Sequence, residues 1–141
     1  MRPALLVRAL GAALLTGVLG GAAVAEGNLA SRPTDLELVL NTDLTMSTNE
    51  YQIETGQYYR WTVTSRGGDE FLLQAPELFR NSWINQVIIE DMEVSPLALY
   101  GIEFDDEGTM VVFFVPIRPG DYPFYIVGQE ERGMIGKFVV R

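Results

Sequence analysis

The chain has 141 residues with neither cysteine nor histidine, and that length is typical of one domain. Its formal net charge is −9, from 10 Lys and Arg against 19 Asp and Glu, which argues against nucleic acid as a partner. Without Cys or His, the composition excludes disulfides, zinc fingers, haem or iron–sulfur ligation by the usual residues, and nucleophile–histidine triads. Hydrophobic residues make up 48%, which predicts a packed core.

Residues 1–25 have the three parts of a secretory signal peptide: two arginines near the start, the apolar run Ala9–Val24, and an A-x-A ending at Ala25. Four glycines interrupt the run, so it falls short of the about 20 apolar residues that span a bilayer. We expect cleavage after Ala25 and a mature domain of residues 26–141. Its 8 basic and 19 acidic residues give −11. We expect a periplasmic or secreted protein with no stable membrane insertion after cleavage.

The mature sequence predicts short strands separated by turns. Alternating or β-branched and aromatic residues indicate strands at 36–40, 58–65, 71–73, 87–94, 102–104, 110–115, 122–127 and 135–140. The segment 45–54 is polar and extended, and one helical turn is expected within 76–81. The strand 110–115 is apolar on both faces, which predicts a central strand buried on both sides. Seven or eight short strands in this length predict an antiparallel sandwich or barrel.

The C-terminal quarter has an ordered set of motifs. It contains a Pro-Gly turn, an aromatic-rich strand, a Gly-Gln pair, a Gly-Met pair and a final strand, at 119–120, 122–126, 128–129, 133–134 and 136–140. This order resembles the C-terminal signature of the cupredoxins, the small blue-copper proteins. Upstream, 68–71 resembles the segment that holds the family's first copper histidine. The resemblance covers 58–140 and implies a Greek-key β-sandwich or barrel of cupredoxin type.

In that family the copper ligands are two His, one Cys and a weak axial Met. The resemblance places the first His at Asp69, the Cys at Ile126 and the second His at Gln129, so only Met134 matches. Ile126 has no donor atom, and a thioether alone does not hold Cu(II). We therefore expect no type 1 copper and no other cofactor. Strand alternation places Tyr122 and Ile126 on one face, which predicts hydrocarbon in the former metal slot.

A different metal site remains an alternative. Asp69, Gln129, Glu130, Glu131 and Met134 could offer oxygen and sulfur ligands near one end of the domain. These donors mix preferences, because carboxylates suit Ca, Mg or Mn while thioethers suit Cu(I). The favoured interpretation is that Met134 packs in the core and the glutamates are solvated.

The remaining polar clusters predict no catalytic site. The acidic tetrad 105–108 lacks the ligand spacing of an EF-hand and is expected to be a hairpin turn. The acids at 90, 91 and 93 are expected at a strand end, as a charged edge that blocks sheet pairing. Adjacent Asp69 and Glu70 would point to opposite strand faces. Lys137, the only lysine, lies within the last expected strand. We therefore do not expect an enzyme.

Two aromatic residues, Phe79 and Trp83, are the candidate partner contacts. With Ile84 they follow Pro76 in a segment that the resemblance places in a connection beside the metal-site end. Such residues either pack against the sandwich, which is favoured, or contact a partner. The acidic net charge would steer a basic partner toward the domain.

The sequence therefore predicts an exported, periplasmic cupredoxin-like protein without type 1 copper. We expect it to act as a non-catalytic interaction or accessory module for another periplasmic protein, in a metal-handling or respiratory context that the resemblance permits. The alternative is a metal-binding or metallochaperone module that uses Met134 and nearby carboxylates.

Overall fold

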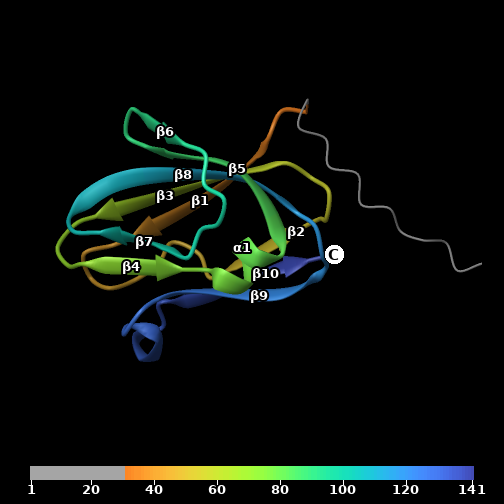
Figure 1. Ribbon diagram of the computed structural model, residues 1–141. Helices are drawn as coiled ribbons and strands as arrows, with labels where there is room; N and C mark the ends of the chain where they lie inside the picture. The colour runs from red at the N-terminus through yellow and green to blue at the C-terminus, as the bar shows by residue number, and fades with distance from the viewer. Residues whose placement is uncertain (1–30) are drawn as a thin grey trace, which may run out of the picture.

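The computed structural model describes residues 31–141, which form two five-stranded β-sheets packed face to face (Figure 1). The first sheet has the order β1 (Thr34–Leu40), β3 (Tyr59–Arg66), β8 (Glu107–Pro116), β5 (Ser82–Ile89), β6 (Met92–Val94). The second has the order β2 (Glu50–Ile53), β10 (Ile135–Val140), β9 (Gly120–Ile126), β4 (Phe71–Gln74), β7 (Gly101–Phe104). Two short helices, α1 (Pro76–Arg80) and η1 (Glu130–Arg132), lie in connections.

The expected β-sandwich is confirmed, with ten strands rather than seven or eight. The sheets are mixed rather than antiparallel, because β1 runs parallel to β3 and β2 runs parallel to β10. The expected signal peptide, residues 1–25, lies outside the described residues. Within residues 31–141 no helix is long and apolar enough to cross a membrane.

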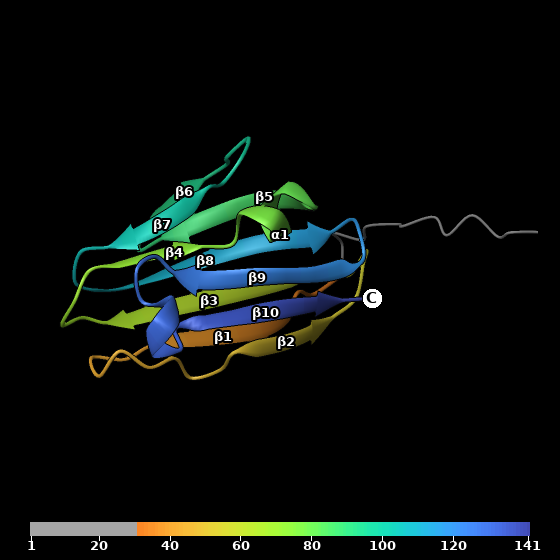
Figure 2. The same cartoon turned by 90° about the horizontal axis from the view of Figure 1, so that it is seen from below.

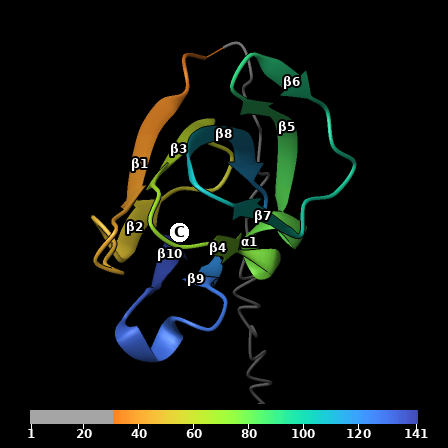
Figure 3. The same ribbon diagram turned by 90° about the vertical axis from the view of Figure 1, so that its left-hand side faces the viewer.

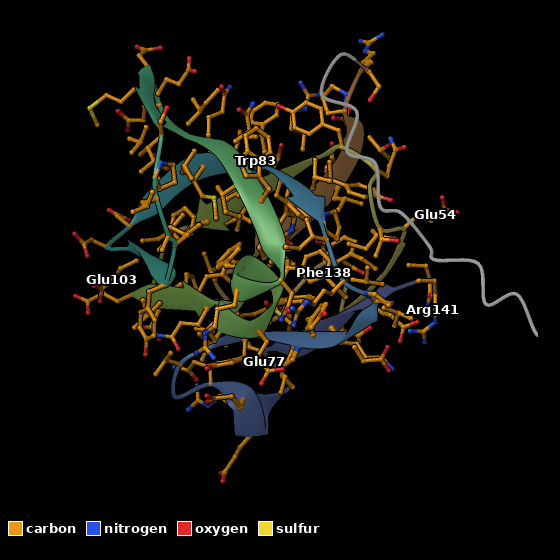
Figure 4. The ribbon with its side chains drawn as sticks, turned by 45° about the vertical axis from the view of Figure 1, so that its right-hand side comes forward. Glu54, Glu77, Trp83, Glu103, Phe138 and Arg141 are labelled. Carbon is orange, nitrogen blue, oxygen red and sulfur yellow. The ribbon has the colours of Figure 1, made fainter. Side chains whose placement is uncertain are left out.

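The core lies between the sheets and is built on a cluster of aromatic rings. Trp61, Tyr51, Phe124 and Phe138 pack with ring centroids 4.8 to 6.3 Å apart. Figure 4 shows Phe138 between the two layers. The expected inward face of β9 is confirmed, since Tyr122, Phe124 and Ile126 are all buried. Burial of such large rings supplies most of the stability of a cysteine-free domain.

One glycine in β10 is required by this packing. A Cβ on Gly136 would clash with the ring of Phe124 and lie 2.5 Å from the carbonyl oxygen of Asn49. Gly136 stands opposite Phe124 in the β9–β10 ladder, so the ring lies flat over its backbone. A side chain at this position would push the second sheet apart.

Four connections meet at one end of the sandwich, which we call the slot end. They are the β1–β2, β3–β4, β7–β8 and β9–β10 connections, and Figure 2 shows them at the left of the molecule. A Cβ on Gly67 would lie 2.5 Å from the Asp106 carboxylate, and one on Gly68 would lie 3.2 Å from Thr42. The sequence resemblance places Asp69 on the β3–β4 connection and Gln129 on the β9–β10 connection. The ligands of a copper centre would therefore have to converge at the slot end.

Three expectations about local structure are wrong. The tetrad 105–108 is not a hairpin turn, because β7 and β8 lie in different sheets and the chain crosses between them there. The segment 87–94 is not one strand: it turns at Glu90 and Asp91, where Glu90 has φ 53°, and returns as the edge strand β6. The strand β8 is central but only partly buried on its outer face, where Val111 and Phe113 are half-buried and Val115 is buried.

Trp83 and Ile84 are not in a connection beside the slot end. They lie in β5, whose first residues pair with the last residues of β8, at the far end of the sandwich. Phe79 lies in α1. The β-branched residues Ile84 and 87–89 favour a strand here, although the polar pair 85–86 interrupts the apolar pattern.

Candidate functional site

The β9–β10 connection, residues 127–134, is the segment that the sequence analysis aligned with a copper-binding loop. It is closed by backbone hydrogen bonds: the amide of Ile126 donates to the Met134 oxygen at 3.0 Å, and the amide of Met134 donates to the Gln129 oxygen at 3.2 Å. Gly128 (φ 81°) and Gly133 (φ 90°) supply the left-handed turns on either side of η1. The loop therefore has a defined shape that does not depend on a metal.

The side chains at the four aligned positions do not form a ligand set. Ile126 and Met134 are both 0% exposed and belong to the hydrophobic core cluster. Gln129 is half-buried at the start of η1. Asp69 lies on the exposed β3–β4 connection, where its Oδ1 accepts the amide of Glu70 at 2.9 Å. The structure thus brings Ile126, Gln129 and Met134 into one loop and leaves Asp69 on another.

These residues do not fit type 1 copper. That centre needs a thiolate and two imidazoles in one plane, with a long thioether bond as the fourth ligand. Here the position aligned with the thiolate holds the buried sec-butyl group of Ile126, and the buried thioether of Met134 belongs to the same core cluster. A copper ion placed in this slot would have hydrocarbon as its nearest neighbour.

The alternative metal site gains no support from the placement of its carboxylates. Glu130 and Glu131 lie on η1, and Glu131 is fully on the surface, while Met134 faces the core. No group of three or more acidic residues within residues 31–141 is arranged to hold a metal ion.

Asp69 and Glu70 are not on a strand, so the argument from opposite strand faces does not apply, yet both are exposed loop residues. Lys137 is in β10 as expected, where it pairs with Glu50 at 3.3 Å.

Two phenols between the sheets have raised pKa values. Burial raises the pKa of Tyr51 to about 12, and its hydroxyl donates to the Glu37 oxygen at 2.6 Å while accepting the indole N–H of Trp61 at 3.3 Å. Burial also raises the pKa of Tyr59, whose hydroxyl accepts the amide of Glu54. The Tyr51 hydroxyl links the Glu37 backbone to the Trp61 ring, and the Tyr59 hydroxyl holds the backbone at Glu54. Because their pKa values are raised, both phenols are neutral at physiological pH.

A second region stands out on the opposite side of the sandwich. Six large hydrophobic side chains are exposed within one stretch of β5, β6 and the connection to β7: Trp83, Ile89, Met92, Val94, Leu97 and Tyr100. We call this set the β5–β7 face. Figure 3 shows the stretch at the upper right, across the molecule from η1. Only three other large hydrophobics are exposed among the described residues, so the clustering is local.

A groove of about 350 Å³ opens within this region. Trp83 and Ile84 line it from β5, and Leu97 and Leu99 line it from the β6–β7 connection. Phe79 closes its base and is 7% exposed, so it packs in the core, whereas Trp83 is 44% exposed. Of the two aromatic residues named as candidate contacts, Trp83 is the accessible one.

Sequence reasoning missed most of the β5–β7 face. Met92, Leu97 and Tyr100 were not singled out, because a single exposed apolar residue carries no signal. One sequence feature could have found them. No Lys or Arg occurs between Arg80 and Arg118, and this stretch holds seven acidic residues as well as the six apolar ones. A cation-free segment rich in both kinds of residue is unusual for a solvated surface.

Neither the family models nor the curated proteins compared with the sequence give a match. The structure does resemble solved structures. A multicopper oxidase from Pseudomonas thermotolerans aligns with TM-score 0.64 and 14% identity, over 84% of this chain and 32% of that one. A copper-containing nitrite reductase from Thermus scotoductus SA-01 aligns with TM-score 0.62 and 13% identity, over 80% and 32%. A multicopper oxidase from Campylobacter jejuni aligns with TM-score 0.57 and 9% identity, over 78% and 30%.

The chain thus spans about a third of the length of these copper enzymes. The aligned regions are cupredoxin-like domains, so the present structure has the cupredoxin fold that the C-terminal motif order predicted. It has this fold without a cysteine to bind type 1 copper. Identities of this size establish the fold alone.

Proposed function

We propose that this cupredoxin-fold protein is an accessory module that works by binding another protein and does so without type 1 copper or catalysis. The observation that supports it most is the β5–β7 face, where apolar side chains as large as Trp83 and Met92 remain exposed. A solvated domain gains by burying such groups, and a cluster of them on one side is typical of a contact surface.

The environment we propose is the bacterial periplasm, with export directed by residues 1–25. The basic, apolar and A-x-A parts of that segment support export. A domain that is stable without disulfides is compatible with an oxidising compartment. The neighbouring folds occur in proteins described as multicopper oxidases and a nitrite reductase, which supports a metal-handling or respiratory context for the partner.

The test of copper independence is a calorimetric titration of the mature protein with Cu(I), Cu(II), Mn²⁺ and Ca²⁺. We expect no tight one-to-one binding of any of these ions. Met134→Leu is the matched variant, because it keeps the buried volume of the side chain and removes the sulfur. Tight Cu(I) binding by the wild type that Met134→Leu abolishes would overturn the proposal and establish the metal-binding alternative.

The test of the contact function is co-purification of the tagged protein from the periplasm of its own organism. We expect a defined partner that is retained by the wild type and by Ile117→Ala and lost by Trp83→Ala. Ile117 is also an exposed apolar residue, but it lies beyond β8 and outside the β5–β7 face. Equal loss in both variants would show that the capture is not specific to this face.

A further inference from the structure

The β5–β6 hairpin extends past the core and carries its inward-facing apolar side chains with it. In the ladder Val87 pairs with Val94 and Ile89 pairs with Met92, so these four residues share one face of the hairpin. Val87, nearest to the sandwich, is buried, whereas Met92 at the tip is 64% exposed. The hairpin therefore presents the continuation of a core face to solvent, and Figure 1 shows it projecting above β8 at the upper left.

The connection from β6 to β7 extends this apolar surface toward the groove. Leu97 is fully exposed and Tyr100 is 70% exposed, and Leu97 lines the groove opposite Trp83. Figure 4 shows Trp83 on β5 and Glu103 beyond it on β7. Trp83 and Leu97 thus line one groove at the edge of the sandwich, and Ile89, Met92 and Val94 lie on the neighbouring hairpin.

Acidic residues outnumber basic ones around this surface. The seven acids between Arg80 and Arg118 are Glu90, Asp91, Glu93, Glu103, Asp105, Asp106 and Glu107. The ion pairs seen within residues 31–141, Arg60–Asp35, Lys137–Glu50 and Arg141–Asp121, use none of them. Two cations lie at the margin: Arg80 lines the groove, and Arg66 stands opposite Glu107 in the β3–β8 ladder.

This pattern distinguishes between possible occupants. In a dimer formed through this face, the acids of one copy would lie close to the same acids of the other copy around a shared apolar centre. Repulsion between these like charges opposes association. The edge strand β6 is only three residues long and carries Glu93, which also opposes pairing of two identical edges. A surface with Lys and Arg around an apolar centre would satisfy both the charges and the exposed hydrocarbon.

We propose that the β5–β7 face docks a protein surface that has an apolar centre rimmed by Lys and Arg. This proposal rests on the contact function proposed above and specifies the partner's chemistry. The partner's apolar residues fill the groove between Trp83 and Leu97 and cover Met92. Its cations lie against the acids of the hairpin tip, Glu90 and Asp91, and against Glu93 on β6.

Fluorescence gives a direct measurement, because the domain has two tryptophans in different environments. Trp83 is half-exposed on the face, whereas Trp61 is 0% exposed in the core. The probe is a short, tryptophan-free peptide of alternating lysine and leucine. We expect it to shift the emission of the wild type to shorter wavelength, with no shift in Trp83→Phe. The apparent Kd should rise with salt concentration.

Matched peptides separate charge from hydrocarbon. A lysine–serine peptide keeps the charge and loses the apolar groups, and a glutamate–leucine peptide keeps the apolar groups and reverses the charge. We expect both to bind at least about tenfold more weakly than the lysine–leucine peptide. Equal binding of all three would overturn the proposal.

Matched variants locate the binding surface. The triple variant Glu90→Gln, Asp91→Asn, Glu93→Gln should weaken binding of the lysine–leucine peptide about tenfold and flatten its salt dependence. The control pair Glu130→Gln, Glu131→Gln on η1 should leave binding unchanged. Leu97→Ser should weaken binding at every salt concentration, whereas Ile135→Ser, an exposed site on β10, should not. Equal effects of face and control variants would overturn the proposal.

Two outcomes separate this proposal from the contact function itself. If the peptide fails to bind while Trp83→Ala still loses the native partner, the partner chemistry is wrong and the contact function stands. If light scattering shows the wild type to be a dimer that Leu97→Ser converts to a monomer, the occupant is a second copy and the proposed partner chemistry is overturned.

Discussion

Two methionines summarise the difference between the slot end and the β5–β7 face. Met134 is the residue that the sequence resemblance aligns with the axial copper ligand, and it is 0% exposed in the same core cluster as Ile126. Met92 stands on the far side of the sandwich at the tip of the β5–β6 hairpin and is 64% exposed. At the slot end the chain buries the thioether that the resemblance aligns with a copper ligand. At the hairpin tip it leaves apolar atoms exposed to solvent.

The contrast shows how one fold can have a closed loop at one end and an exposed apolar surface elsewhere. The β9–β10 connection holds its shape through its own backbone hydrogen bonds and two left-handed glycines, so it needs no metal. The β5–β7 face instead exposes large apolar side chains, and covering them with another surface would lower the free energy. The predictions below run from the largest expected effect to the smallest.

The two methionines should respond very differently to the same substitution. We expect Met134→Ala to lower the free energy of unfolding by about 3 kcal/mol, because it removes buried hydrocarbon and leaves a cavity. Met92→Ala should change it by less than about 0.5 kcal/mol, because the side chain packs against little. Urea denaturation of both variants measures the difference. Equal values would mean that the contrast between the two regions is not real.

Two strand glycines give a similar contrast for added atoms. We expect Gly136→Ala to destabilise the domain by about 2 kcal/mol, because the new methyl group clashes with Phe124 and Asn49. Gly108→Ala in β8 meets its nearest atom, on Phe104, at 3.7 Å and should be nearly neutral. Thermal unfolding of the two variants provides the comparison, and a Gly136→Ala domain as stable as the wild type would show a looser second sheet.

The buried phenol of Tyr51 should make stability depend on alkaline pH. Its pKa is raised from 10.0 to about 12, so the unfolded chain loses the proton first as pH rises. The contribution is fully present below pH 10 and is lost as pH rises through about 12. Tyr51→Phe should reduce this pH dependence, and at neutral pH it should cost about 1 kcal/mol because the Trp61 indole N–H loses its acceptor. An unchanged alkaline slope would contradict the assignment to Tyr51.

Substitutions of surface charges should give the smallest changes in the free energy of unfolding, and the sign of the change should differ between Asp35 and Asp91. Asp35 pairs with Arg60 at 2.6 Å, so Asp35→Asn should cost a few tenths of a kcal/mol, roughly the value of an exposed ion pair. Asp91 lies among other acids without an ion pair in the described part of the chain, so Asp91→Asn should be neutral or slightly stabilising. Urea denaturation at low and high salt measures this. High salt should reduce the difference in free energy of unfolding between the two variants.

The fold was largely predictable, because the signals that specify it are local. Period-two alternation identified β1, β3 and the inward face of β9, and the order of the C-terminal motifs indicated the cupredoxin arrangement. The prediction that type 1 copper is absent rests on residue type alone, since Ile126 and Gln129 carry neither a thiolate nor an imidazole. The predictions that were wrong concerned tertiary placement: whether 105–108 closes a hairpin depends on the sheet to which β7 and β8 belong, and whether β8 is buried on both faces depends on what covers the first sheet.

The sequence by itself determined the residue chemistry of this protein: no thiolate, no imidazole, an acidic surplus and a run of cation-free chain from 81 to 117. Only the tertiary structure decided where those residues lie. It buried Met134 and Phe79, exposed Trp83, Met92 and Leu97, and set the acids around them. The physical reason is that ligand chemistry belongs to single side chains, whereas exposure depends on what the rest of the chain packs against each one.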